Sequence, residues 1–191
     1  MSVLRKGEKH ERIHEYNRAN DLLVVAVDSS GSMSHMERYV SSILDDLLRQ
    51  VGDMAKKHGI DVKWDNLQGL EHTNEATKMY PVTGDEWKRM MEHYYADGGN
   101  DFDCVLRLVN DDKLEEHNYD SVTIINLSDG LDEMNSNFSG LVVDDYIKDG
   151  RLKWVDALIG DAHDIARAGQ CATKDYYKGL RKQVVLHVKE Y

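Results

Sequence analysis

The sequence has few of the residues that mark several classes of protein. Its two cysteines, Cys104 and Cys171, are too few for a disulfide framework in a chain of 191 residues, and they favour a reducing, cytoplasmic setting. It has one proline, Pro81, and 41% of its residues are hydrophobic, which excludes a collagenous or disordered chain. A chain of this length is long enough for one domain with a core and too short for two ordinary domains.

Long apolar runs and an excess of positive charge are also missing. The longest apolar run, 22–27, has six residues, whereas a helix that spans a bilayer needs about 20. The counts of 24 Lys and Arg against 35 Asp and Glu give a net charge of −11. Because nucleic acids and anionic membrane surfaces repel such a chain on average, we expect neither as a partner.

Strand-like and helix-like segments alternate along the chain. Residues 22–27 and 122–127 are largely apolar, as in strands that are buried on both faces. Further strands are predicted at 60–64, 76–82, 152–159 and 184–188, and helices at 36–55, 83–95, 102–109 and 161–168. Strands separated by helices indicate an α/β fold with a mostly parallel sheet, in which 76–82 is an edge strand.

The remaining segments set the predicted boundaries. Residues 1–20 are polar and predict an N-terminal polar helix or tail, followed by a single domain over 21–191. Residues 65–75 and the stretch after Gly130 are polar and are predicted to be connections. Thr83 and Glu86 have the spacing of a capping box, which predicts the start of the 83–95 helix.

Oxygen-bearing side chains follow two of the predicted strands. Asp28, Ser30 and Ser32 come directly after 22–27, and Asp129 follows 122–127. A third cluster, 98–101, includes Asn100 and leads into a helix. Ligands of open parallel sheets collect at the carboxyl ends of the strands, so we expect these clusters to meet. A site of oxygen donors without His or Cys favours Mg²⁺, Mn²⁺ or Ca²⁺ over zinc.

These motifs resemble those of a known family. The segment Asp28-Ser29-Ser30-Gly31-Ser32 is similar to the Asp-x-Ser-x-Ser signature of von Willebrand factor A (vWA) domains, and Gly98-Gly99-Asn100-Asp101-Phe102 and Ser128-Asp129-Gly130 stand where the intracellular prokaryotic and phage branch has Gly-Gly-Thr-Asp-Phe and Thr-Asp-Gly. The resemblance covers about residues 20–160. It implies a Rossmann-like vWA fold, with one antiparallel edge strand and helices on both faces of the sheet.

The resemblance also implies a metal-ion-dependent adhesion site (MIDAS). Carried over residue by residue, Ser30 and Ser32 would ligate the cation through their hydroxyls, while Asp28 and Asp129 would hold it directly or through water. Asn100 departs from the family, which has threonine there. Its amide oxygen is a suitable ligand for Mg²⁺ or Ca²⁺, but it is bulkier and presents no hydroxyl.

The function implied by the resemblance is metal-dependent binding of another protein. In the family, a carboxylate of the partner commonly completes the coordination of the cation. Stand-alone relatives of this branch often work with AAA+ ATPases of the MoxR type, and others are phage proteins, so either a MoxR-type ATPase or a phage or host protein is an expected partner. We expect no enzymatic activity, because the chain shows no complete catalytic constellation.

Three alternatives remain open. The string His10-Glu11-Arg12-Ile13-His14 is an HExxH motif, which in a helix would place two histidines on one face for zinc, with Glu11 as the base of a metallopeptidase. An aspartate at the end of a first strand also resembles the nucleophile of Mg²⁺-dependent haloacid-dehalogenase phosphatases, although their second aspartate is Ser30 here. The third alternative is a metal-free structural or assembly protein, such as a phage component.

The acidity of the chain is predicted to gather at one end of the sheet. The acidic residues in or beside the three clusters are Asp28, Asp101, Asp129, Asp132, Glu133, Asp144 and Asp145. Such a rim would attract a divalent cation and would repel a partner carboxylate until that cation is bound. Partner binding is therefore expected to require metal.

Overall fold

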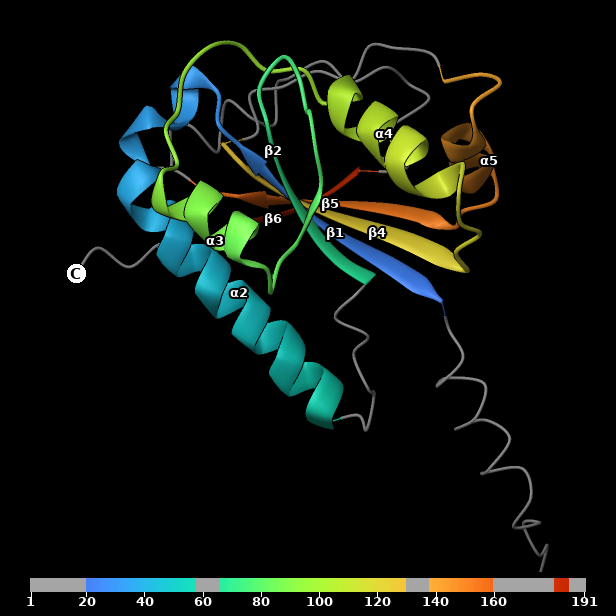
Figure 1. Cartoon of the computed structure of the whole chain (residues 1–191), viewed down its shortest axis with the longest axis horizontal. Coiled ribbons are helices and arrows are strands. Elements are labelled where there is room, and N and C mark those ends of the chain that lie inside the picture. Colours follow the sequence, from blue (N-terminus) through green and yellow to red (C-terminus); the bar gives the residue numbers. More distant parts are fainter. Residues whose placement is uncertain (1–19, 58–65, 130–137, 160–180, 186–191) are drawn as a thin grey trace, which may run out of the picture.

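A single sheet forms the centre of the molecule in the computed structural model, which describes residues 20–57, 66–129, 138–159 and 181–185 (Figure 1). Its strand order is β3-β2-β1-β4-β5-β6. The strands are β1 (Asp21–Asp28), β2 (Leu67–His72), β3 (Tyr80–Pro81), β4 (Ser121–Ser128), β5 (Leu152–Leu158) and β6 (Arg181–Val185). All neighbouring pairs are parallel except β2 and β3, so the predicted mostly parallel sheet with an antiparallel edge is confirmed.

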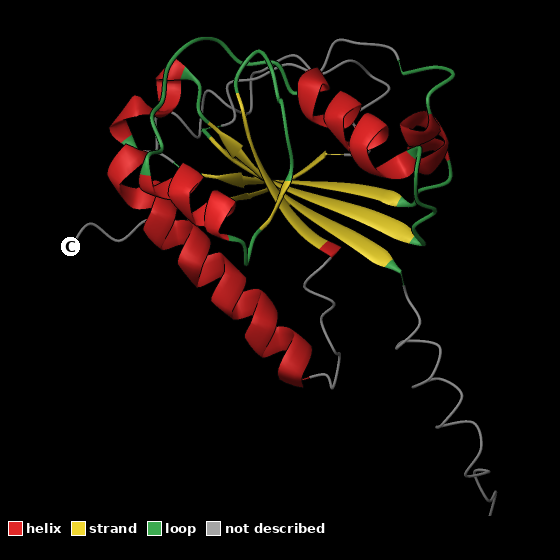
Figure 2. Ribbon diagram, viewed as in Figure 1, coloured by secondary structure: helices red, strands yellow, loops and turns green. Residues whose placement is uncertain are grey.

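Helices cover both faces of the sheet, as predicted. They are the 3₁₀ helix η1 (Gly31–His35), α2 (Glu37–Lys57), α3 (Asp85–Glu92), α4 (Asp103–Val109), the π-helical turn η3 (Asn110–Leu114) and α5 (Val142–Lys148). Figures 1 and 2 show α2 and α3 on one face, and α4 and α5 on the other. No helix in the described ranges is long and apolar enough to cross a membrane.

The fully apolar strand β1 separates two hydrophobic cores. Because successive side chains of a strand point to opposite faces, Val24 and Ala26 join the core under α4 and α5, whereas Val25 and Val27 join the core under α2 and α3. All four side chains are at most 1% exposed. This burial explains why the strand carries no alternation of polar and apolar residues.

Strand β2 corrects the prediction of a connection at 65–75. This strand was not predicted because it contains the polar residues Gln68, Glu71 and His72, although most of it is buried. Gly69 has a packing role here, because a Cβ added at this position would lie 2.3 Å from the ring of Trp87 on α3. The strand predicted at 60–64 lies outside the described residues.

The edge strand β3 is shorter than the predicted 76–82. It pairs with β2 through the partners Gln68 with Pro81 and Gly69 with Tyr80. Proline has no N–H to donate to a further strand, which suits it to the edge of a sheet.

Two helix predictions are also corrected. Helix α3 begins at Asp85, and its N-cap is Gly84 in an extended conformation with no side-chain cap, so the predicted capping box of Thr83 and Glu86 does not start it. The stretch after Gly130, predicted to be a polar connection, contains α5. Its short apolar face is too brief to show a helical period in the sequence.

Some predictions fall on residues that the structure does not describe. The N-terminal helix or tail at 1–20 is described only at residue 20, and the helix at 161–168 lies outside the described ranges. The last strand was predicted at 184–188, whereas β6 covers Arg181–Val185.

Candidate functional site

The predicted site lies where β1, β2 and β4 end together. Asp28 is the last residue of β1 and is aligned with His72, the last residue of β2. Ser128 ends the neighbouring strand β4. These three side chains are at most 1% exposed, so the carboxyl edge of the sheet holds a buried polar cluster.

The Asp28 carboxylate is the centre of this cluster. Its Oδ1 accepts a hydrogen bond of 2.8 Å from the Ser30 backbone N–H. Its Oδ2 accepts bonds from the Asn100 amide at 2.6 Å and from the Ser128 hydroxyl at 2.7 Å. Two segments far apart in the sequence therefore meet the Asp28 loop at this carboxylate and fix its orientation.

The two serine hydroxyls of the Asp-x-Ser-x-Ser motif lie side by side. Ser30 Oγ and Ser32 Oγ are 3.1 Å apart. Ser30 occupies the N-cap position of η1, but its side chain makes no capping bond to that helix. The hydroxyl pair is thus available to a ligand, with Ser30 buried and Ser32 exposed.

The 97–101 loop is bonded to the Asp-x-Ser-x-Ser loop through its backbone. Asp97 N–H donates to Ser29 C=O at 2.8 Å, and Gly31 N–H donates to Gly98 C=O at 3.0 Å. Gly98 has a φ of +83°, which glycine adopts without the strain that a side chain would bring. Asp101 N–H donates to Thr73 C=O after β2, which ties the loop to a second strand end.

Asn100 presents its amide group to the site. While its Nδ2 donates to Asp28, its Oδ1 is a buried acceptor that no donor among the described residues reaches. A buried acceptor without a donor costs free energy, on the order of 1–3 kcal/mol. A cation would satisfy it, so the donor set fits a hard divalent ion.

Asp129 follows Ser128 directly and is 1% exposed. The pKa of the Tyr94 phenol is raised mainly by burial. The nearby negative charges of Asp28 and Asp129 also raise it. The structure therefore places Asp129 at the same edge as the other four predicted residues, which the bonds described above join directly. No group of three or more His, Cys, Asp or Glu among the described residues is arranged to hold a metal ion. The candidate site is of a different kind, since several of its oxygens belong to hydroxyl and amide groups.

The predicted acidic rim is only partly present. Asp144 lies on α5, is 3% exposed, and forms an ion pair with Lys148 at 2.5 Å. Lys148 compensates the charge of Asp144 within α5, so Asp144 does not add to the predicted acidic rim. Asp132 and Glu133 lie outside the described residues, as does the HExxH string at 10–14.

Comparison with known proteins identifies the fold and leaves the family open. No protein-family model matches the sequence, and no curated protein matches it. Among solved structures, proximal thread matrix protein 1 from the mussel byssus, in a form described as having a zinc-occupied MIDAS motif, superposes with a TM-score of 0.51 at 12% identity. The match covers 87% of this chain and 44% of that chain. A mutant of the PilB minor pilin from Streptococcus sanguinis superposes with a TM-score of 0.51 at 14% identity, covering 88% of this chain and 57% of that one.

The described chain has a Rossmann-like, vWA-type fold. It spans about half the length of these two solved structures. At these identities the likeness concerns the fold alone.

Sequence reasoning assigned no role to two residues of the candidate site. Ser128 was part of the third motif, and its position directly before Asp129 at the end of a strand was the available signal. Tyr94 falls within the helix predicted at 83–95, but α3 ends at Glu92 and the Tyr94 hydroxyl donates to the Asp28 backbone carbonyl. No sequence pattern marks that contact.

Proposed function

We propose that this chain is a metal-dependent protein-binding module of the vWA type. The observation that carries the proposal is the convergence of Ser30, Asn100 and Ser128 on the Asp28 carboxylate at the carboxyl edge of the sheet. A divalent cation bound there would be reached by a partner from the open side, since Ser32 and the 97–99 loop are exposed.

Five residues would hold the cation: Asp28, Ser30, Ser32, Asn100 and Asp129. All five offer oxygen, which favours Mg²⁺, with Mn²⁺ and Ca²⁺ as close alternatives. The cation supplies an electrophilic centre to which a partner carboxylate binds by a charge-assisted contact. This chain's own residues orient that centre: Ser128 and the Ser30 N–H hold Asp28, and the loop bonds fix Asn100 beside it.

The proposed partner is a protein that contributes an aspartate or glutamate. The family resemblance favours a MoxR-type AAA+ ATPase or a phage or host protein in the cytoplasm. A catalytic role is not proposed, because Ser30 stands at the position of the general acid that the phosphatase alternative needs. Its hydroxyl lies against Ser32 instead.

A second candidate, a metal-free structural domain, has one observation in its favour. The Asp28 carboxylate already accepts three hydrogen bonds, two of them from the side chains of Asn100 and Ser128. Such a network satisfies the charge partly without any cation. The two candidates differ at Asn100 Oδ1. In the metal-binding candidate this oxygen contacts the cation, whereas in the metal-free candidate it stays without a donor among the described residues.

Titration with Mn²⁺, followed by electron paramagnetic resonance, tests the proposal. We expect the chain to bind one Mn²⁺ that Mg²⁺ displaces, and we expect Asp28→Ala and the double variant Ser30→Ala, Ser32→Ala to abolish binding. The matched control is Ser41→Ala, Ser42→Ala, which removes two exposed hydroxyls from α2. Zn²⁺ is included because a structural neighbour is described with a zinc-occupied MIDAS.

The outcome that would contradict the proposal is equally specific. Binding of Mn²⁺ that survives both site variants, or that the α2 control reduces as strongly, would place the ion elsewhere. Absence of any binding by the folded wild type would favour the metal-free candidate.

A further inference from the structure

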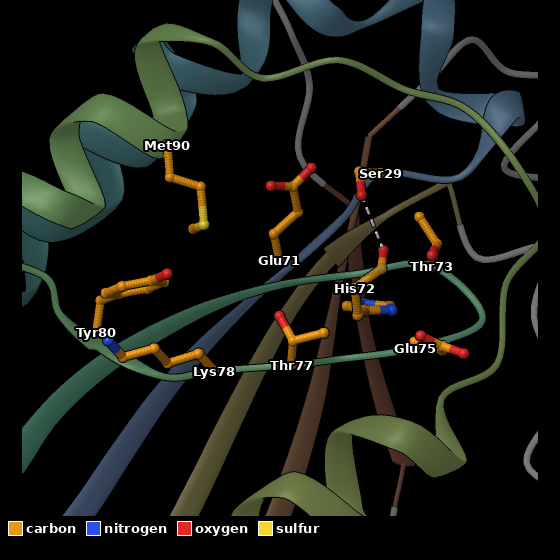
Figure 3. A pocket seen from close by; sticks show the side chains of 9 residues that line it. All are labelled: Ser29, Glu71, His72, Thr73, Glu75, Thr77, Lys78, Tyr80 and Met90. Atoms are coloured by element: carbon orange, nitrogen blue, oxygen red, sulfur yellow. Dashed lines mark hydrogen bonds between the residues drawn. The ribbon is translucent and has the colours of Figure 1, made fainter.

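A pocket of about 360 Å³ lies beside the candidate metal site, at the carboxyl end of β2 (Figure 3). Ser29 lines it, so the pocket and the Asp-x-Ser-x-Ser loop share a wall. Glu71 and His72 of β2, Tyr80 of β3 and Met90 of α3 also line it. The pocket therefore lies where a partner bound at the metal site would reach it.

The charged groups of the pocket are mainly acceptors of hydrogen bonds. Glu71 is half-buried, and Glu75 is an exposed carboxylate on the loop after β2. Among the described residues, no Lys or Arg forms an ion pair with either carboxylate. Ser29, which lines the same pocket, donates from its hydroxyl to the His72 backbone carbonyl at 3.1 Å.

A buried hydrogen-bond chain holds the His72 ring on the face of β2 opposite to Glu71. The Asp156 carboxylate accepts from Trp154 Nε1 at 2.8 Å and from Asn126 Nδ2 at 3.4 Å. The Asn126 carbonyl oxygen therefore faces His72 Nε2 at 2.9 Å, and this nitrogen must donate. The ring also packs edge-on against Phe102 in the core under α4, so its nitrogens are not acceptors for a ligand in the pocket.

We infer that this pocket binds the guanidinium group of an arginine on the same partner that supplies the metal-bound carboxylate. The identity of the partner rests on the proposed function, whereas the arginine is inferred from the pocket alone. A guanidinium group carries five N–H donors in a planar fork, which complements acceptors that lie on different sides. Tyr80 and Met90 provide surfaces for its aliphatic stem.

Two observations favour an organic cation over a second metal ion. Tyr80 and Met90 give the pocket an aromatic and an apolar wall, which suit the stem of an organic cation better than a hydrated metal ion. The net charge of −11 also favours a basic partner segment.

Lys78 is the positive charge that the pocket already contains. Its Nζ lies 5.0 Å from the centre of the Tyr80 ring, in a cation–π contact. Because Lys78 lines the same pocket as Glu71 and Glu75, it repels an incoming guanidinium group. Removal of this charge is therefore expected to strengthen arginine binding, whereas removal of either carboxylate weakens it.

The test is a titration of the ¹⁵N-labelled full chain, in EDTA, with N-acetyl-arginine amide. N-acetyl-citrulline amide has nearly the same shape without the charge and is the ligand control. We expect the arginine probe to shift the amide resonances of residues 71–80 and to bind at least about fivefold more tightly than the citrulline probe. Glu71→Gln and Glu75→Gln should weaken arginine binding by a similar factor, and Lys78→Gln should strengthen it about two- to threefold.

The variant control is Glu92→Gln, an exposed carboxylate on α3 that does not line the pocket. It removes the same charge and should leave binding unchanged. Equal binding of arginine and citrulline would overturn the inference, as would equal weakening by Glu92→Gln and Glu75→Gln, because bulk charge would then explain the effect. Since Glu75 is exposed, its variant is expected to fold even if Glu71→Gln does not.

A second titration separates this inference from the proposed function. In Mg²⁺, a short peptide with one arginine and one glutamate should bind more tightly than its citrulline counterpart, and EDTA should remove the contribution of the glutamate only. Loss of the glutamate effect with a preserved arginine effect would refute the metal-dependent function and support the pocket. The reverse result would refute the pocket.

Discussion

The amide of Asn100 donates a hydrogen bond of 2.6 Å from Nδ2 to Asp28 Oδ2, and this contact leaves its own Oδ1 buried without a donor among the described residues. A threonine, which the resembling family has at this position, offers a single hydroxyl instead. The asparagine thus supports the carboxylate with one end and offers an oxygen with the other. The arrangement gives Asn100 a positioning role in addition to its proposed role as a ligand.

Asn100→Ala should lower the affinity for Mn²⁺ by about tenfold, because it removes one oxygen ligand and one donor to Asp28. Asn100→Thr should restore a large part of that loss through its hydroxyl. Calorimetric titration of the three proteins measures the effect. If alanine binds Mn²⁺ as tightly as asparagine does, the residue is not a ligand.

Ser128→Ala should lower the free energy of unfolding by about 1–2 kcal/mol, since it removes a hydrogen bond to a buried carboxylate. The matched control lies on the same strand: Ser121 Oγ donates to Asp21 Oδ1 at 2.7 Å, but that bond is exposed. Ser121→Ala should therefore cost less than about 0.5 kcal/mol. Urea denaturation measures both variants, and equal losses would contradict the role of Ser128 at Asp28.

Gly69→Ala should destabilise the fold by about 2 kcal/mol or more, because the added methyl group would lie 2.3 Å from the Trp87 ring. Trp87 is 3% exposed and has little room to move away. In a Trp87→Leu background the same substitution should cost less. A double-mutant cycle in urea measures this coupling, and additive losses would show that the strand and α3 do not meet at Gly69.

Cys104 should react slowly with thiol reagents while the protein is folded. Burial, together with the charges of Asp101 and Asp103, raises the pKa of its thiol to about 12. At pH 8 the thiolate is therefore scarcer in the folded state than in the unfolded state, where the pKa is about 8.5. In a Cys171→Ser background, labelling with 5,5′-dithiobis(2-nitrobenzoic acid) should be at least about 100-fold faster in urea than in buffer. Similar rates would contradict the burial of Cys104.

The strongest sequence predictions concern segments whose residues all favour one state. The apolar runs behind β1 and β4 need to be buried on both faces, and that requirement alone predicts parallel strands with helices on either side. The long apolar period of α2 is equally unambiguous. Polar residues directly after β1 and β4 then had to lie at the carboxyl edge, so the candidate site followed from the order of the segments.

Sequence reasoning failed where the role of a residue depends on a distant neighbour. Gly69 lies in the stretch predicted to be a connection, but it packs against Trp87 of α3. The polar residues of the same stretch form a strand, because their partners lie on β1 and β4. The pocket at Glu71 has no sequence signal for the same reason, because β2, β3, α3 and the loop after β1 build it together.

By itself, the sequence determined the class of fold and the chemical type of the site, since burial of apolar runs and the oxygen-rich loops are local properties of the chain. Only the tertiary structure decided which groups face each other. It brought Ser128 and Asn100 to Asp28 across 100 and 72 residues of sequence, and it set Glu71 beside Ser29. Contacts between segments so far apart depend on strand order and register, which emerge only when the whole sheet has formed.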